Sequence, residues 1–246
     1  MTDQRETRDV CIVGAGPAGL TAGLFTARAG LDTLVINAGE PILRRNAHLE
    51  NVPGFPAGVN SRLFLDMLAD QADRNGCARR GGQVTAVTDA YGDSLAVETD
   101  DGTVRTDYVV CTSWADTEYL DIDAVGLTTR GSKTYIDVNE HGETGVEGLY
   151  AAGRIAGEPH QTVVSAGHGA TVALSVVHDS EIPFYHDWVA PEGYFTDRGR
   201  EVSPGCEEID EAERQRRERE SMAVMQEYFD DPHPDEPTQH PSVREG

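Results

Sequence analysis

The feature that most constrains this chain is a glycine-rich segment near its N-terminus. Residues 10–13 form an apolar run that predicts a buried strand, and Gly14, Gly16 and Gly19 follow at the spacing of a dinucleotide-binding turn. Gly14 would form the turn, Gly16 would let a phosphate approach the backbone, and Gly19 would let the next helix pack closely on the strand. We expect this helix to begin near Ala18, with its free N–H groups facing a pyrophosphate.

The residues that follow place this turn in a strand–helix–strand unit. A helix is predicted over residues 18–29 and a second strand over residues 34–36. In dinucleotide folds an acidic residue at the end of the second strand hydrogen-bonds the adenosine ribose, whereas this chain has Asn37, with Glu40 three residues later. We therefore predict an α/β, Rossmann-like three-layer fold with a parallel sheet and a small β-meander.

Farther along, the apolar pattern predicts a second helix, the meander and another helix of small residues. Ser61 is the expected N-cap of the second helix, and residues 112–135 are interpreted as a polar connection. The predicted elements are a helix over 62–74, strands over 83–88, 94–99, 103–111, 135–138 and 146–153, and a helix over 161–178.

The composition changes at residue 183, which predicts two parts of the chain. Residues 1–182 would form the Rossmann-like domain, and residues 183–246 would form a C-terminal extension. A charged helix is predicted in the extension over residues 209–229.

Apolar residues occur in that helix only near its end. Met222, Met225 and Phe229 have i, i+3, i+7 spacing, so we expect them to dock on the core of the same subunit. The rest of the chain carries four prolines and predicts a disordered tail, in which His233 and His240 would be solvated.

The charge balance excludes one class of partner. The net charge is −23, and Lys133 is the only lysine. An acidic, lysine-poor surface with an ordinary apolar content is typical of a protein adapted to very high salt, where screening removes most of the self-repulsion. Nucleic acid is therefore excluded as an expected partner.

The cysteines indicate no metal site and no disulfide framework, because no pair has CxxC or zinc-ligand spacing. Cys11 and Cys111 lie in apolar strands and are expected to be buried thiols, whereas Cys206 is expected to be exposed. No run of 18 apolar residues and no N-terminal signal segment occurs. We expect a cytoplasmic protein with no membrane partner.

Three separated segments together resemble the thioredoxin reductase-like flavoproteins. Residues 11–20 are the glycine-rich turn, and residues 50–56, Glu-Asn-Val-Pro-Gly-Phe-Pro, are similar to the E-N-x-P-G-F segment beside the flavin in that family. Residues 148–169 contain Gly-Leu-Tyr-Ala-Ala-Gly and then His-Gln-Thr-Val-Val-Ser-Ala-Gly-His-Gly, which resemble the third flavin-side run of the family. In order and spacing the three segments cover most of residues 9–178.

The resemblance implies that FAD is the cofactor, that the chain is an oxidoreductase and that it forms a homodimer. It points to no catalytic side chain and to no metal ligand. The residues that would hold the pyrophosphate, the ribose, the flavin ring and the ribityl chain are Gly14, Gly16, Pro17, Ala18, Gly19, Asn37, Glu40, Asn51, Gly153, Arg154 and Gln161.

The chain also departs from the family pattern. The family inserts a second nucleotide domain, which binds NADPH and carries a CxxC, but here Cys111 and Tyr150 are fewer than 40 residues apart. A single βαβ unit already takes about 30 residues, so we expect the FAD-binding part without this insert, and not a thioredoxin reductase. The electron donor would then be a redox protein or free nicotinamide nucleotide.

Two cofactor positions differ as well. Ser113 replaces a family Gly, and Arg154 replaces an Asp that accepts hydrogen bonds. Arginine accepts none, although it can pair with a pyrophosphate. These losses leave open a non-catalytic descendant of the flavin domain that acts as a binding or scaffold module. A third hypothesis is that Arg44 and Arg45 receive a 2′-phosphate, so that the site binds NADP(H) instead of FAD.

Overall fold

The centre of the structure is one mixed sheet, with seven strands among the residues that this computed structural model describes, 6–89 and 94–239. The strand order is β3-β2-β1-β6-β5-β4, and β9 pairs with the second half of β6. The strands are β1 (Glu6–Val13), β2 (Thr33–Asn37), β3 (Ala78–Gly81), β4 (Val84–Asp89), β5 (Leu95–Thr99), β6 (Gly102–Cys111) and β9 (Leu149–Ala151). β5 pairs antiparallel with both β4 and β6, and the other strand pairs are parallel, which confirms the predicted α/β class.

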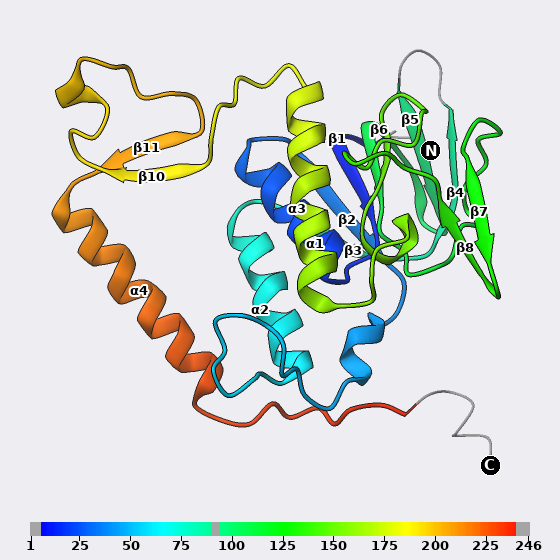
Figure 1. Cartoon of the computed structure of the whole chain (residues 1–246), viewed down its shortest axis with the longest axis horizontal. Coiled ribbons are helices and arrows are strands. Elements are labelled where there is room, and N and C mark those ends of the chain that lie inside the picture. The colour runs from blue at the N-terminus through cyan, green and yellow to red at the C-terminus, as the bar shows by residue number, and fades with distance from the viewer. Residues whose placement is uncertain (1–5, 90–93, 240–246) are drawn as a thin grey trace.

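Helices cover one face of this sheet (Figure 1). They are α1 (Pro17–Arg28), α2 (Ser61–Arg74) and α3 (Thr162–Asp179). α1 and α3 cross in close contact, because a Cβ at Gly169 would overlap the carbonyl oxygen of Ala18. The apolar residues between helices and sheet are small or β-branched, for example Ala22, Val35 and Val172, so the two layers lie close together.

The opposite face of the sheet is covered by the chain between β6 and β9 (Figure 1). This layer contains the hairpin of β7 (Leu127–Arg130) and β8 (Lys133–Ile136), and the short helix η2 (Gly153–Ala156) follows β9. Tyr119 and Ile122 are buried against the sheet. The prediction of a polar connection over residues 112–135 is therefore wrong, because these two apolar side chains and β7 lie within it.

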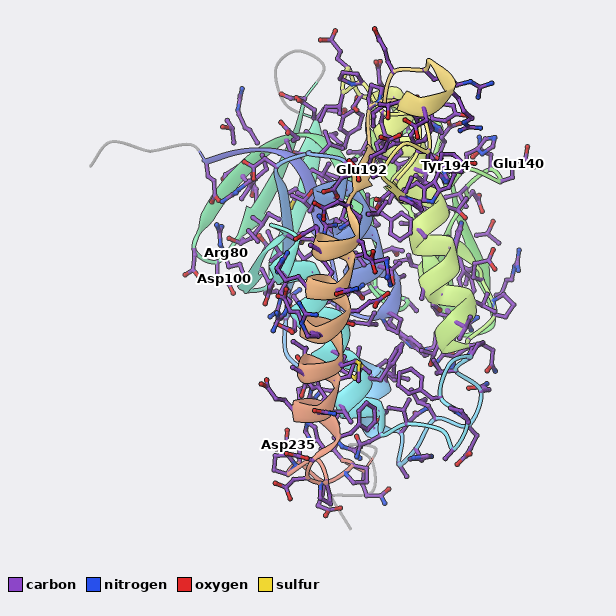
Figure 2. The ribbon with its side chains drawn as sticks, turned by 90° about the vertical axis from the view of Figure 1, so that its left-hand side faces the viewer. Arg80, Asp100, Glu140, Glu192, Tyr194 and Asp235 are labelled. Carbon is purple, nitrogen blue, oxygen red and sulfur yellow. The ribbon has the colours of Figure 1, made fainter. Side chains whose placement is uncertain are left out.

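The extension holds elements that the sequence pattern did not predict. β10 (Trp188–Pro191) and β11 (Cys206–Ile209) form a two-stranded parallel sheet with η3 (Thr196–Arg198) between them. α4 (Glu211–Phe229) then runs apart from the rest of the molecule and returns to it near α2 (Figure 1). Figure 2 shows this helix from the side, with Glu192 and Tyr194 near its start and Asp235 beyond its end.

Two expectations for the extension are wrong. Met222 and Met225 are 63% and 40% exposed, and Phe229 is 50% exposed with its ring 6.3 Å from that of Phe55. They do not dock in the core, because the more buried side of α4 carries other residues, among them Arg217, Val224 and Tyr228. The His233 side chain is only 7% exposed and its Nε2 lies 2.8 Å from Asp66 Oδ2, so it is not solvated. His240 lies outside the described residues.

Two boundaries also differ. The first strand begins at Glu6 rather than at residue 10, since its polar start pairs with β6. The N-cap of α2 is Asn60, whose Oδ1 accepts the N–H groups of Arg62 and Leu63, whereas the Ser61 hydroxyl donates to the Asn46 carbonyl.

In the described part of the chain no helix combines the length and the apolar character that crossing a membrane requires.

Candidate functional site

A cleft of about 840 Å³ opens at the carboxyl ends of β1, β2 and β6, where α/β sheets bind their ligands. Residues from all three sequence segments meet in it. Of the predicted site residues, those that line the cleft are Gly14, Gly16, Pro17, Ala18, Asn37, Glu40, Asn51, Arg154 and Gln161. Gly19 and Gly153 lie behind the lining, where they let elements pack closely.

The turn between β1 and α1 leaves one backbone position open. Gly14 has φ +112°, and a Cβ at Gly19 would overlap its carbonyl oxygen. A Cβ at Gly16 would meet no atom within 4 Å, so the backbone there and the first N–H groups of α1 are accessible from the cleft. This is the geometry that an anion needs in order to approach a helix N-terminus.

Sequence reasoning missed Thr112, which braces this turn from β6. Its Oγ1 lies 2.9 Å from the carbonyl oxygens of both Val13 and Gly14, and its N–H donates to Val13. The only sequence signal was its place directly after the buried strand. Thr112 holds the glycine turn at a fixed distance from the other half of the sheet.

Asn37, at the end of β2, is already hydrogen-bonded to the protein. Its Oδ1 accepts the Ala15 N–H at 2.9 Å, and its Nδ2 donates to the Gly39 carbonyl at 2.6 Å. Asn37 therefore positions the glycine turn and also lines the cleft, where its second amide N–H can donate to a ligand. Glu40 is the exposed carboxylate nearby, 3.7 Å from Arg44 Nε.

Arg44 is engaged with the protein as well. Its guanidinium pairs with Asp66 at 2.7 Å and with Asp235 at 2.9 Å, in addition to Glu40. The carboxylates of Asp66 and Asp235 therefore already bind the Arg44 guanidinium, which the NADP(H) hypothesis assigned to a 2′-phosphate.

At the other end of the cleft a hydrogen bond joins the second and third segments. Asn51 Nδ2 donates to Gln161 Oε1 at 2.7 Å, although 110 residues separate them. Gln161 is the N-cap residue of α3 and makes no side-chain cap bond, so the N–H groups of the first turn of α3 are left without a side-chain partner. Thr162 and Ser165 from this turn line the cleft.

Gly153 and His168 fix the turn that follows β9. Gly153 has φ +75°, and its N–H donates to Nδ1 of His168 at 3.1 Å, which requires a neutral imidazole with its proton on Nε2. Burial lowers the pKa of His168, and the carboxylate of Glu158 opposes this effect. A Cβ at Gly153 would contact Ala18, so this glycine lets η2 approach α1.

Arg154, Trp114 and His160 also line the cleft, which has a volume of about 840 Å³ with all three side chains in place. Arg154 Nη2 donates to the Tyr135 hydroxyl at 2.7 Å, and its Cζ lies 5.0 Å from that ring centroid. The Trp114 and His160 rings meet edge to face at 4.2 Å. Burial, and next to it the positive charge of Arg154, lowers the pKa of His160.

The cysteines lie away from this chemistry. Burial raises the pKa of Cys11 and of Cys111 to about 12 and that of Cys77 to about 11. Cys206 is partly exposed, in the extension. None of the four lines the cleft as the structure describes it, so the site offers no thiolate.

Two family models match the chain. "FAD binding domain" matches residues 9–48, and "Pyridine nucleotide-disulphide oxidoreductase" matches residues 64–169. The chain carries a thioredoxin reductase-like FAD-binding domain. The size of the cleft, the open backbone at Gly16 and the two helix N-termini are compatible with an extended dinucleotide.

Curated relatives and solved structures agree with the family models. The thioredoxin reductases of Listeria monocytogenes and Aquifex aeolicus are 41% and 42% identical over 91 and 96 residues, which is 36% and 38% of this chain. These matches cover 28% and 29% of the relatives, so the chain spans less than a third of their length. The thioredoxin reductase structures from Gloeobacter violaceus and Streptococcus pyogenes share the fold.

The two thioredoxin reductase structures have TM-scores of 0.60 and 0.61 at 19% and 15% identity to this chain. The alignments cover 74% and 71% of this chain and 100% and 98% of those chains.

Proposed function

We propose that the chain is a flavin oxidoreductase domain that binds FAD in the cleft and receives electrons from an external donor. The observation that carries the proposal is the open backbone at Gly16 beside the α1 N-terminus, in a cleft that is also lined by the hydrogen-bonded pair Asn51 and Gln161. When bound, FAD supplies the electron chemistry. A redox protein or free nicotinamide nucleotide as donor, and a homodimer as the assembly, remain predictions.

The residues of the chain would bind and orient the cofactor from end to end. The N–H groups of α1 would hold the pyrophosphate, and Glu40 with the free N–H of Asn37 would meet the ribose hydroxyls. The α3 N-terminus would favour negative charge at the far end. Trp114 and His160, edge to face in the lining of the cleft, would exclude water from it.

An absorbance spectrum between roughly 350 and 500 nm tests the proposal, because bound flavin absorbs there. The protein is incubated with FAD in molar salt and then freed of unbound FAD. Gly16→Glu puts a carboxylate in the phosphate position without a clash, and we expect FAD to bind about 100-fold more weakly, because charge-assisted hydrogen bonds are lost. Gly167→Glu is the matched control, since it also has open space and lies away from the cleft.

A second candidate is a non-catalytic binding module. It is favoured by Arg154, whose guanidinium is held by the Tyr135 hydroxyl and provides no acceptor for a ribityl group. A protein that stays colourless after incubation with FAD, together with a stoichiometric protein partner in a high-salt pull-down, would select this candidate. Retained yellow colour that Gly16→Glu abolishes and Gly167→Glu keeps would select the oxidoreductase.

A further inference from the structure

Two arginine side chains lie against the ring of Tyr135, and a lysine follows on the same hairpin. Arg154 donates to the Tyr135 hydroxyl, and the Cζ atoms of Arg154 and Arg130 lie 5.0 and 5.8 Å from the Tyr135 ring centroid. Lys133 is on the same hairpin, where its backbone pairs with that of Arg130. Lys133 and Arg154 both line the cleft.

These cations lack the acidic partners that most other arginines of the domain have. In the part of the chain that the structure describes, Arg8, Arg28, Arg79 and Arg80 each lie within 4.0 Å of a carboxylate, as does Arg44. No carboxylate there comes that close to Arg130, Lys133 or Arg154. Asp116, the acid that lines this part of the cleft, accepts the Glu118 N–H instead.

Like charges held close together repel one another unless an anion lies between them. The chain has 43 acidic residues and one lysine. That lysine pairs with Arg130 in the hairpin and lines the cleft together with Arg154, and among the described residues neither arginine has a carboxylate within 4.0 Å. Tyr135 is buried and its hydroxyl fixes the Arg154 guanidinium, so this member of the cluster is held in place before a ligand arrives. This is the chemistry of a phosphate or carboxylate site.

The cluster is separate from the phosphate position at Gly16. Gly16 begins α1, on the helical face of the sheet, whereas Arg130 and Lys133 belong to the β7–β8 hairpin on the opposite face (Figure 1). The pyrophosphate of one extended dinucleotide would occupy the α1 N-terminus. The anion at the hairpin therefore belongs to a second molecule.

We propose that Arg130, Lys133 and Arg154 bind the phosphate or carboxylate of a second, anionic small molecule, the reaction partner of the flavin site. This inference rests on the proposed function, and it names the substrate class. Nicotinamide nucleotides and small organic acids both present such a group.

Calorimetric titration of the FAD-saturated protein with inorganic pyrophosphate tests this site directly. It is done at the lowest salt at which the chain stays folded, because molar salt shortens the screening length to about 3 Å. We expect pyrophosphate to bind, and Arg154→Gln and Lys133→Gln each to weaken it about tenfold. Arg198→Gln is the matched control, an arginine stacked on Tyr194 at 4.2 Å in the extension, and should change nothing.

The same titration on Gly16→Glu separates this inference from the proposed function. That variant blocks the α1 phosphate position, so pyrophosphate binding that still depends on Arg154 supports the cluster even in a chain that takes up no FAD. The inference is overturned in either of two cases. One is that pyrophosphate binding is absent or insensitive to Arg154→Gln and Lys133→Gln. The other is that Arg154→Gln weakens FAD itself about tenfold and leaves the pyrophosphate titration unchanged.

Discussion

At the scale of single residues, the site depends on side chains that position the backbone rather than on reactive groups. His168 is the clearest case, because its Nδ1 accepts the N–H of Gly153 and so holds the turn that carries Arg154. Thr112 and Asn37 act in the same way on the glycine turn. Each of these bonds fixes a piece of main chain at a turn beside the cleft.

Protonation of His168 should therefore destabilise the fold at low pH. Its folded-state pKa is lowered by burial, so between that value and about 6.5 the unfolded chain binds more protons than the folded one. The free energy of unfolding should fall as the pH drops below 6.5 and should not depend on this group above it. His168→Asn retains an acceptor but does not titrate, so urea unfolding at pH 7.5 and 5.5 should show a smaller pH dependence than in the parent chain. An equal loss in both proteins would contradict this role.

At the scale of elements, the crossing of α1 and α3 depends on one glycine. A Cβ at Gly169 would overlap the Ala18 carbonyl, so Gly169→Ala should cost about 1–3 kcal/mol of stability through overpacking. Gly167 lies in the same helix and has open space, so Gly167→Ala should stabilise by about 0.5–1 kcal/mol through helix propensity. Urea unfolding of both variants measures the two signs, and two changes of the same sign would disprove the close crossing.

The elements also show what the sequence could predict. The glycine turn, the helices α1 and α3 and the meander follow from local spacing and apolar periodicity, and the structure confirms them. β3 has the sequence Ala-Arg-Arg-Gly and carries no strand pattern; its pairing with β2 at the sheet edge makes it a strand. β10 was missed because its packing partners, such as Phe195, come from the extension itself.

In the candidate site, too, some features could be predicted from the sequence and others could not. Residues in motifs, such as Gly16, Asn51 and Gln161, could be named from their neighbours in sequence, and the structure brings them to one cleft. The hydrogen bond between Asn51 and Gln161 could not be predicted, because the two residues are 110 positions apart and only the folded sheet brings their loops together. The roles of Thr112 and His168 were likewise hidden, because a side-chain bond to a distant carbonyl or N–H leaves no periodic signal.

At the scale of the whole molecule, the end of the chain returns to support a wall of the cleft. His233 Nε2 bonds Asp66 on α2, and Asp235 pairs with Arg44 on η1 (Ile42–Arg45). Ile42, also on η1, lines the cleft, so these contacts connect the extension to the proposed FAD site.

The buried histidine of this connection gives the test. His233→Ala removes a side chain that is only 7% exposed and leaves Asp66 with one partner fewer, so we expect a loss of about 1 kcal/mol, discounted because Asp66 is half-exposed. His141→Ala is the control, because that side chain is 59% exposed beside Glu140 and should cost less than about 0.5 kcal/mol. Both are measured by urea unfolding, and FAD affinity should weaken only for His233→Ala, since η1 loses an indirect support. Equal effects of the two variants would mean that the end of the chain rests on the surface without bracing the cleft.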